Sequence, residues 1–285
     1  MNADDFGLTA GVNRAIVELH KAGVLTSATL MARAAATDEA IELALANPAL
    51  GVGCHVVLVD GEPVLPPKEL PTLVDQRTGQ FQPTLGKFLP RLFTGRIRAA
   101  EIEAEAAAQI ALLQKRGLHL THVDTHKHTH MFPAVLGPVL RAAKTAGISK
   151  VRNPFEPEWA VHATPRASAT RVAEVFALRR MGPYFRRLIA SHGVSATDGT
   201  IAVVGTGTLD GDAVRSLLRQ LPTGTWELVT HPGYNDADLA KVRTRLRESR
   251  DVERNALGSI REFPAVELIS FAGVGSTGIA ASTIV

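Results

Sequence analysis

The chain has 285 residues, of which 45% are hydrophobic and 21% are charged, so it can bury the core of one large α/β domain. The formal net charge of +3 is too small to indicate a nucleic-acid-binding protein. The single cysteine, Cys54, excludes an intramolecular disulfide and a zinc site built from cysteines.

The sequence shows neither an apolar run of the roughly 18 residues that a membrane span needs nor a recognisable signal peptide. We therefore expect a cytoplasmic protein, or one that is peripheral at the inner surface of the membrane. The oligomeric state is left open, with a homodimer as the alternative to a monomer.

Short apolar segments alternate with helical patterns along the chain. The predicted strands comprise residues 27–31, 52–58, 118–130, 150–153, 200–204, 226–230 and 266–271. The predicted helices comprise residues 11–21, 38–46, 98–116, 133–146, 168–190, 210–221 and 247–262. This alternation predicts a parallel α/β sheet covered by helices, and about seven units indicate a closed or nearly closed barrel. An open doubly wound sheet is the alternative.

Two long stretches interrupt the alternation. Residues 59–83 are rich in proline, glycine and aspartate, which is typical of a functional loop rather than a linker. Residues 154–190 begin irregularly, with three prolines, and continue as an arginine-rich helical part. We expect this insertion to form a lid over the barrel mouth.

The end of the chain contains a misleading motif. Residues 273–278 satisfy the dinucleotide fingerprint G-x-G-x-x-G, but only seven residues follow, too few for the helix and second strand of such a site. We therefore interpret residues 273–285 as a flexible C-terminal tail, and residues 1–272 as a single barrel domain.

The most informative stretch is residues 121–130 (THVDTHKHTH), which holds four of the ten histidines. In an extended segment Asp124, His126, His128 and His130 would share one face. Such clusters are unusual outside metal or proton-transfer sites. A histidine-rich surface loop is the alternative, but a strand pattern leads into the cluster and a helix start follows it.

Other polar residues follow predicted strands at distant positions, namely Asp4 and Asp5, His55 and His231. In a β/α barrel the carboxyl ends of all strands face one mouth, so these residues can converge with the histidine cluster. One carboxylate and two imidazoles suit Zn²⁺, Fe²⁺ or a related divalent ion. A spare carboxylate can take a proton from the metal-activated water, and a spare histidine can protonate a leaving group. The pattern predicts a metal-assisted hydrolase of amides or esters, without choosing among the histidines of the cluster.

Four motifs resemble those of the YdjC-like carbohydrate deacetylases: residues 2–9 (NADDFGLT), 53–55 (GCH), 121–133 (THVDTHKHTHMFP) and 230–233 (THPG). The resemblance covers nearly the whole chain. It implies a distorted, TIM-like (β/α) barrel that binds one divalent metal ion, Zn²⁺ or Mg²⁺.

The resemblance also implies roles for individual residues. The metal ligands would be Asp5, His55 and His126. The general base would be Asp4, and the general acid His231. Four further residues would lie around the ligands or bind the sugar, with plain scaffold or surface roles as the alternatives: Asp124, His128, His130 and Arg152.

Residues 56–67 (VVLVDGEPVLPP) further resemble the branch of this family that is associated with hopanoid biosynthesis. This implies removal of the N-acetyl group from an N-acetylglucosaminyl hopanoid, by an enzyme with peripheral membrane contact. The alternatives are a deacetylase of soluble chitooligosaccharides, another barrel metalloenzyme such as an amidohydrolase or aldolase, and a non-catalytic protein that binds sugar or lipid.

The sequence departs from the family pattern at its beginning. Family members carry several more apolar residues before the NADD motif, and here only Met1 precedes it. Either the start codon is assigned too late or the first strand is truncated. A truncated first strand would leave the backbones of its neighbours unpaired and Asp4 and Asp5 on a flexible end.

Overall fold

The computed structural model describes residues 1–260, 266–275 and 282–285. The large sheet contains β1 (Asn2–Phe6), β2 (Ser27–Leu30), β3 (Gly51–Val56), β6 (Val123–Thr125), β7 (Gly199–Ile201), β8 (Gly224–Thr230), β9 (Val266–Leu268) and β10 (Ser282–Ile284). Its strand order is β6-β3-β2-β1-β8-β10-β9, with β7 also paired to β8, and all of these pairs are parallel. The short β4 (Val74–Asp75) and β5 (Gln80–Phe81) form a separate antiparallel pair.

Backbone hydrogen bonds close the sheet into a barrel. Beyond β6, the amide of Arg152 donates to Val123 over 3.1 Å, and the amide of Thr200 in β7 donates to Phe155 over 3.3 Å. Residues 150–155 therefore bridge β6 and β7, and β8 links β7 back to β1. The seven segments of this ring, β1, β2, β3, β6, residues 150–155, β7 and β8, confirm the predicted parallel α/β barrel.

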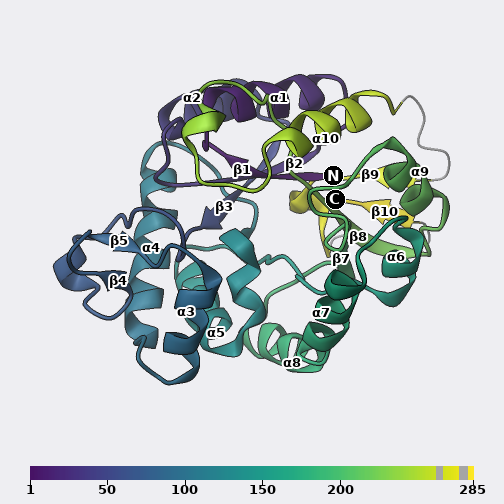
Figure 1. The fold of residues 1–285 in the computed structure, drawn as a ribbon. Helices are drawn as coiled ribbons and strands as arrows, with labels where there is room; N and C mark the ends of the chain where they lie inside the picture. Colours follow the sequence, from purple (N-terminus) through teal and green to yellow (C-terminus); the bar gives the residue numbers. More distant parts are fainter. Residues whose placement is uncertain (261–265, 276–281) are drawn as a thin grey trace.

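Helices surround the strands, as Figure 1 shows. They are α1 (Ala10–Lys21), α2 (Thr37–Ala46), α3 (Leu85–Phe93), α4 (Ala99–Lys115), α5 (Pro133–Thr145), α6 (Glu158–Ala163), α7 (Ala169–Arg179), α8 (Gly182–His192), α9 (Gly211–Arg219) and α10 (Glu248–Gly258). The short 3₁₀ segments within the described residues are η1 (Pro67–Glu69), η2 (His126–Met131), η3 (Leu239–Lys241) and η4 (Phe271–Gly273). None of the helices in the described ranges is long and apolar enough to cross a membrane.

The first strand is present, contrary to the prediction. Residues 2–6 form β1, all five of them are buried, and Asn2 pairs with Ser27 on one side and with Val229 on the other. Strand β1 is paired on both sides, with β2 and with β8. Asp4 and Asp5 therefore lie in a held strand and not on a flexible end.

The predicted flexible tail is wrong for its last residues. Ser282–Ile284 form β10, which pairs with β8 and with β9, and Ile284 and Val285 are fully buried. β10 pairs with the first part of β8 and β1 with the last part, so the two chain ends lie close together (Figure 1). Residues 276–281 of the predicted tail lie outside the described residues.

The predicted lid divides into helices with different neighbours. Arg171 and Glu174 of α7 line the large cavity at the barrel mouth, whereas α8 packs along α5 and α6 contacts α9. Within residues 154–190, it is α7 that reaches the mouth.

Candidate active site

The polar residues singled out in the sequence converge at the carboxyl ends of the parallel strands. Asp4 and Asp5 lie near the end of β1, His55 near the end of β3, and Asp124 in β6. His231 directly follows β8. This is the end at which β/α barrels place their reacting groups.

A bulge in β1 lets two consecutive carboxylates serve one site. In a regular strand Asp4 and Asp5 would point to opposite faces. Asp5 instead has a left-handed backbone with φ of 65°, and the register with β2 shifts between Ala3 and Phe6. Such irregularities redirect side chains next to active sites.

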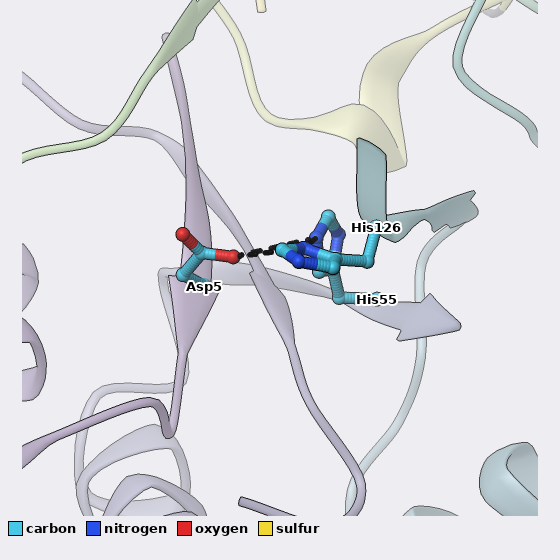
Figure 2. A group of neighbouring side chains, drawn as sticks. All are labelled: Asp5, His55 and His126. Atoms are coloured by element: carbon cyan, nitrogen blue, oxygen red, sulfur yellow. Dashed lines mark hydrogen bonds and ion pairs between the residues drawn. The ribbon is translucent and has the colours of Figure 1, made fainter. Parts of the chain in front are cut away.

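Asp5, His55 and His126 bring three potential ligand atoms together (Figure 2). Asp5 Oδ1 lies 3.6 Å from His55 Nε2 and 3.3 Å from His126 Nδ1, and the two nitrogens are 3.2 Å apart. Ligand atoms about 2.0–2.2 Å from one ion lie roughly 3–3.5 Å from each other. The three side chains therefore fit a divalent ion with little rearrangement.

A second observation supports this fit. Asp5 Oδ1 is buried and has no hydrogen-bond partner, and a buried oxygen of that kind is costly unless something positive binds it. Its sister atom Oδ2 accepts a hydrogen bond of 2.5 Å from Arg250. Burial opposes ionisation of Asp5, but Arg250 and His126 hold its pKa well below the usual range, so the carboxylate is charged.

Asp124 orients His55. Its Oδ1 lies 2.8 Å from His55 Nδ1, so the opposite ring nitrogen, Nε2, faces Asp5 and His126. A carboxylate behind a histidine is the usual way to fix the tautomer of a metal ligand. Burial opposes protonation of His55, yet Asp124 raises its pKa to about 9.

Arg152 is fully buried and holds Asp4 with two hydrogen bonds, of 2.6 Å to Oδ1 and 2.8 Å to Oδ2. It also pairs with Asp124 at 2.5 Å and with Glu227 at 2.6 Å. Burial opposes ionisation of Asp4, but Arg152 keeps the pKa of this carboxyl far below its usual range. Arg152 does not line the cavity, so its position fits orientation of Asp4 and not contact with substrate.

Asp4, His55 and Asp124 form a second cluster of potential ligand atoms. The guanidinium of Arg152 already supplies the positive charge there, since it contacts both carboxylates. A metal ion would have to displace this buried cation, so the geometry favours the cluster around Asp5.

His231 lies beside Asp4, with its Nε2 3.8 Å from Asp4 Oδ2. Its backbone N–H donates to Glu253 Oε2 over 2.6 Å, and burial lowers the pKa of the imidazole to about 4. Burial also raises the pKa of Glu253 to about 7. A carboxylate and an imidazole are thus adjacent next to the proposed ligands.

The last two histidines of the cluster differ in their surroundings. Strand β6 ends at Thr125, and Lys127 and His128 adopt left-handed backbones, so the predicted shared face does not form. His128 lines the cavity, and its Nδ1 is buried without a partner. His130 is fully buried between the hydroxyl of Thr125 and the carbonyl of Arg152, which is a supporting position.

A cavity of about 1580 Å³ opens above these residues. Its floor includes Asp4, Asp5, His55, His126 and His231. Its walls come from the β4–β5 region, from residues 241–247 and from α7, and they are largely polar or charged. A volume of this size exceeds that of many small-ligand pockets and leaves room for more than one sugar ring.

Several residues that contact the site were not found from the sequence. Asn2 and Thr29 each donate to Asp4 Oδ1 over 3.1 Å, and the others are Glu227, Arg250 and Glu253. Glu227 carried a signal, since it is a charged residue inside an apolar strand. No sequence signal distinguished Arg250 and Glu253, because most helices of a barrel carry charged residues on their solvent-facing side.

Comparisons with known proteins identify relatives of this chain. A carbohydrate deacetylase of Listeria monocytogenes is 30% identical over 275 residues, which are 95% of this chain and 97% of that protein. A chitooligosaccharide deacetylase of Salmonella paratyphi B is 40% identical over 151 residues, so the match spans 52% of this chain and 56% of that relative.

A solved structure shows the same fold. It is an Enterococcus faecalis protein, provisionally described as a cellobiose-phosphate cleavage protein, and it matches 90% of this chain and 89% of its own with a TM-score of 0.69 and 26% identity. The model of the family described as YdjC-like protein matches residues 1–263. The chain therefore belongs to the YdjC-like protein family.

Proposed function

We propose that the protein is a metal-dependent hydrolase that removes the N-acetyl group from an amino-sugar. The observation that carries the proposal is the arrangement of Asp5, His55 and His126 at the floor of the cavity. Asp5 Oδ1 is buried without a hydrogen-bond partner and lies within 3.6 Å of His55 Nε2 and His126 Nδ1, two nitrogens that are 3.2 Å apart. The names of the relatives, carbohydrate and chitooligosaccharide deacetylases, support the substrate class.

In this proposal Asp5, His55 and His126 hold one divalent ion, Zn²⁺ or Mg²⁺. When bound, such an ion lowers the pKa of a water molecule and polarises the amide carbonyl. Asp124 keeps His55 in the tautomer that leaves Nε2 free.

Asp4 and His231 are the proposed general base and general acid. Asp4 lines the cavity, and its Oδ2 accepts one hydrogen bond from Arg152 and lies 3.8 Å from His231 Nε2, so this oxygen is the candidate to take the proton of the attacking water. The amine that leaves when the amide C–N bond breaks must gain a proton, and His231 Nε2 is the candidate donor. Because His231 Nε2 lies 3.8 Å from Asp4 Oδ2, the proton removed from water can be returned through this pair.

The test measures metal content and acetate release with purified protein. Asp5→Ala, His55→Ala and His126→Ala should each lose the stoichiometric metal, because three ligands leave no redundancy. His128→Ala should keep the metal and lower the activity, and the exposed His119→Ala should change neither. Retention of metal by His126→Ala together with loss by His128→Ala would overturn the ligand assignment.

The roles of Asp4 and His231 need a separate measurement. Asp4→Asn and His231→Ala should both retain metal, and each should lower kcat by about 10²–10⁴-fold, the usual worth of general acid–base catalysis. The His231 variant should lose less on substrates with better leaving groups. A His231 variant with normal rates on amides would exclude the general-acid role.

For the acetylated substrate we propose two classes that can be separated. The resemblance of residues 56–67 to the hopanoid-associated branch favours an N-acetylglucosaminyl hopanoid, whereas the polar cavity and the relatives favour a soluble chitooligosaccharide. Comparison of kcat/KM for N,N′-diacetylchitobiose and for an N-acetylglucosaminyl glycolipid in micelles decides between them.

The glycolipid proposal adds a surface that can be tested. Arg180, which directly follows α7, and Arg186 and Arg187 of α8 are exposed, and so is Tyr184 of α8. Each arginine near an anionic membrane surface contributes about 1 kcal/mol to binding. Co-sedimentation with anionic vesicles should weaken in high salt and when the three arginines are replaced by serine. If the wild-type protein ignores anionic vesicles at low salt, the membrane contact is excluded.

A further inference from the structure

Arg250 reaches the proposed metal site from a distant part of the chain. It lies in α10, it is 1% exposed, and its Nη2 donates to Oδ2 of Asp5 over 2.5 Å. The other oxygen of Asp5, Oδ1, receives no hydrogen bond and is the atom nearest to His55 and His126. In Figure 2 one oxygen of Asp5 points toward the two histidines and the other points away.

We propose that Arg250 is a positioning residue that makes Asp5 a ligand through one oxygen only. The inference rests on the proposed function, since it concerns the same metal site. A carboxylate can bind a metal through one oxygen or through both, and it can rotate between these modes. A charge-assisted hydrogen bond from a permanently charged guanidinium occupies Oδ2 and directs Oδ1 to the ion.

The neighbouring carboxylate shows the contrast. Arg152 holds both oxygens of Asp4, which therefore has no free oxygen facing the two histidine nitrogens. Arg250 holds a single oxygen of Asp5 and leaves the other unpartnered. The two arginines thus leave adjacent aspartates in different states. Both oxygens of Asp4 accept hydrogen bonds, whereas Oδ1 of Asp5 remains available to an ion.

Arg250 is itself fixed by the loop that follows β8. Its Nε donates to the carbonyl of Leu246 over 3.0 Å, and its own carbonyl accepts the N–H of Gly233 over 3.3 Å. A Cβ on Gly233 would lie 3.0 Å from Cδ of Arg250, which is closer than ordinary van der Waals contact, so the absence of a side chain at Gly233 eases this approach. These contacts leave the guanidinium little freedom, as a positioning role requires.

The experiment compares Arg250→Ala and Arg250→Lys with Arg254→Ala. Arg254 lies on the same helix, but it pairs with Asp251 and stacks on Tyr234, away from the site. The affinity for Zn²⁺ is measured by competition with a chelator, and the visible spectrum of the Co²⁺-loaded protein reports the coordination of the ion. Circular dichroism of the metal-free proteins checks that each variant folds.

Loss of a residue that orients a metal ligand usually costs about 10–100-fold in metal affinity. We expect a loss of that size and an altered Co²⁺ spectrum for Arg250→Ala, a smaller loss for Arg250→Lys, and no change for Arg254→Ala. Added guanidinium should restore affinity to Arg250→Ala, which a general loss of stability would not allow.

Two results would overturn the inference. Wild-type affinity and an unchanged Co²⁺ spectrum in Arg250→Ala would overturn it alone, and the proposed metal site would stand. Failure of the wild-type protein to bind Zn²⁺ or Co²⁺ would overturn the proposed function together with it.

Discussion

Arg152 carries one positive charge among three buried carboxylates, those of Asp4, Asp124 and Glu227. Removal of one partner from a buried ion-pair network leaves uncompensated charge, which typically destabilises a protein by about 3–5 kcal/mol. This network therefore depends on Arg152, which contacts all three carboxylates, for stability as well as for orientation of Asp4.

We predict that Arg152→Met lowers the free energy of unfolding by about that amount in urea denaturation. The loss should be larger at pH 8 than at pH 5, because protonation of the crowded carboxylates relieves their repulsion. Arg141→Met, which removes an exposed pair with Glu103, serves as control and should cost about 1 kcal/mol or less. Equal effects of the two substitutions would contradict the prediction.

Glu156 offers a pH-dependent test away from the proposed metal ligands. It is 2% exposed, accepts the N–H of Val204 over 2.6 Å, and burial raises its pKa from 4.5 to about 7. The folded state therefore binds the proton more tightly than the unfolded state. The resulting stability is complete below pH 4.5 and is lost as the pH rises to about 7.

Glu156→Gln should flatten this part of the stability profile, since glutamine does not titrate. Melting temperatures of the two proteins at several values between pH 4.5 and pH 8 provide the measurement. The exposed Glu158→Gln is the matched control and should keep the wild-type slope. A wild-type slope in the Glu156 variant would show that other groups cause it.

At the scale of elements, the turn after β6 decides the geometry of the site. Pairing with β3 ends at Thr125, and the hydroxyl of Thr125 then accepts the N–H of His130 over 2.9 Å. The chain turns through left-handed Lys127 and His128, which leaves His126 facing His55. Lys127 lines the cavity and pairs with Asp60 at 2.6 Å.

Asp60 joins two of the loops that line the cavity. Besides Lys127, it pairs with Arg243 in the loop after β8. Partly exposed pairs of this kind contribute about 0.2–1 kcal/mol each, so their loss should loosen the loops without unfolding the barrel.

We predict that Asp60→Ala makes residues 241–247 more accessible and raises KM more than it lowers kcat. Limited trypsin digestion should cleave after Arg243 or Arg245 faster than in the wild type. Asp238→Ala, which removes an exposed pair with Lys241 in the same loop, should leave the rate of cleavage unchanged. Identical digestion of Asp60→Ala and wild type would exclude this link between the loops.

At the scale of the whole molecule, the proposed ligands come from β1, β3 and the turn after β6. They meet only when the barrel has formed, so an ion should bind the folded chain and not the unfolded one. Binding to the folded state alone stabilises a protein by about 2.7 kcal/mol when the free ligand is at 100 times its Kd.

Zn²⁺ should therefore raise the melting temperature of the chelator-treated wild-type protein, and the increase should grow with Zn²⁺ concentration. Asp5→Ala should show no such increase, and the exposed His119→Ala should behave as wild type. An equal increase in the Asp5 variant would place the bound ion elsewhere.

The sequence by itself determined the repeated strand–helix pattern, a parallel sheet covered by helices and the strand ends at which polar residues gather, whereas a barrel and an open doubly wound sheet both remained possible. These features follow from local hydrophobic periodicity, which the chain carries in 27–31, 52–58 and the later segments. It also brought Asp5, His55 and the histidine cluster together as candidates, because the ends of parallel strands share one mouth. Strand β10 could not be predicted from the sequence, because three residues are too few to show a hydrophobic periodicity. It forms by pairing with β8 and β9.

Only the tertiary structure decided how the candidate residues present their atoms. The bulge at Asp5 and the left-handed turn at Lys127 and His128 depend on pairing with distant strands, so the alternation of an ideal strand misplaces His128 and His130. Arg250 meets Asp5 across 245 residues of chain, a contact that no local pattern contains. The sequence specifies which residues stand at the strand ends. The direction of each side chain there depends on the segments that pack around it in the folded protein.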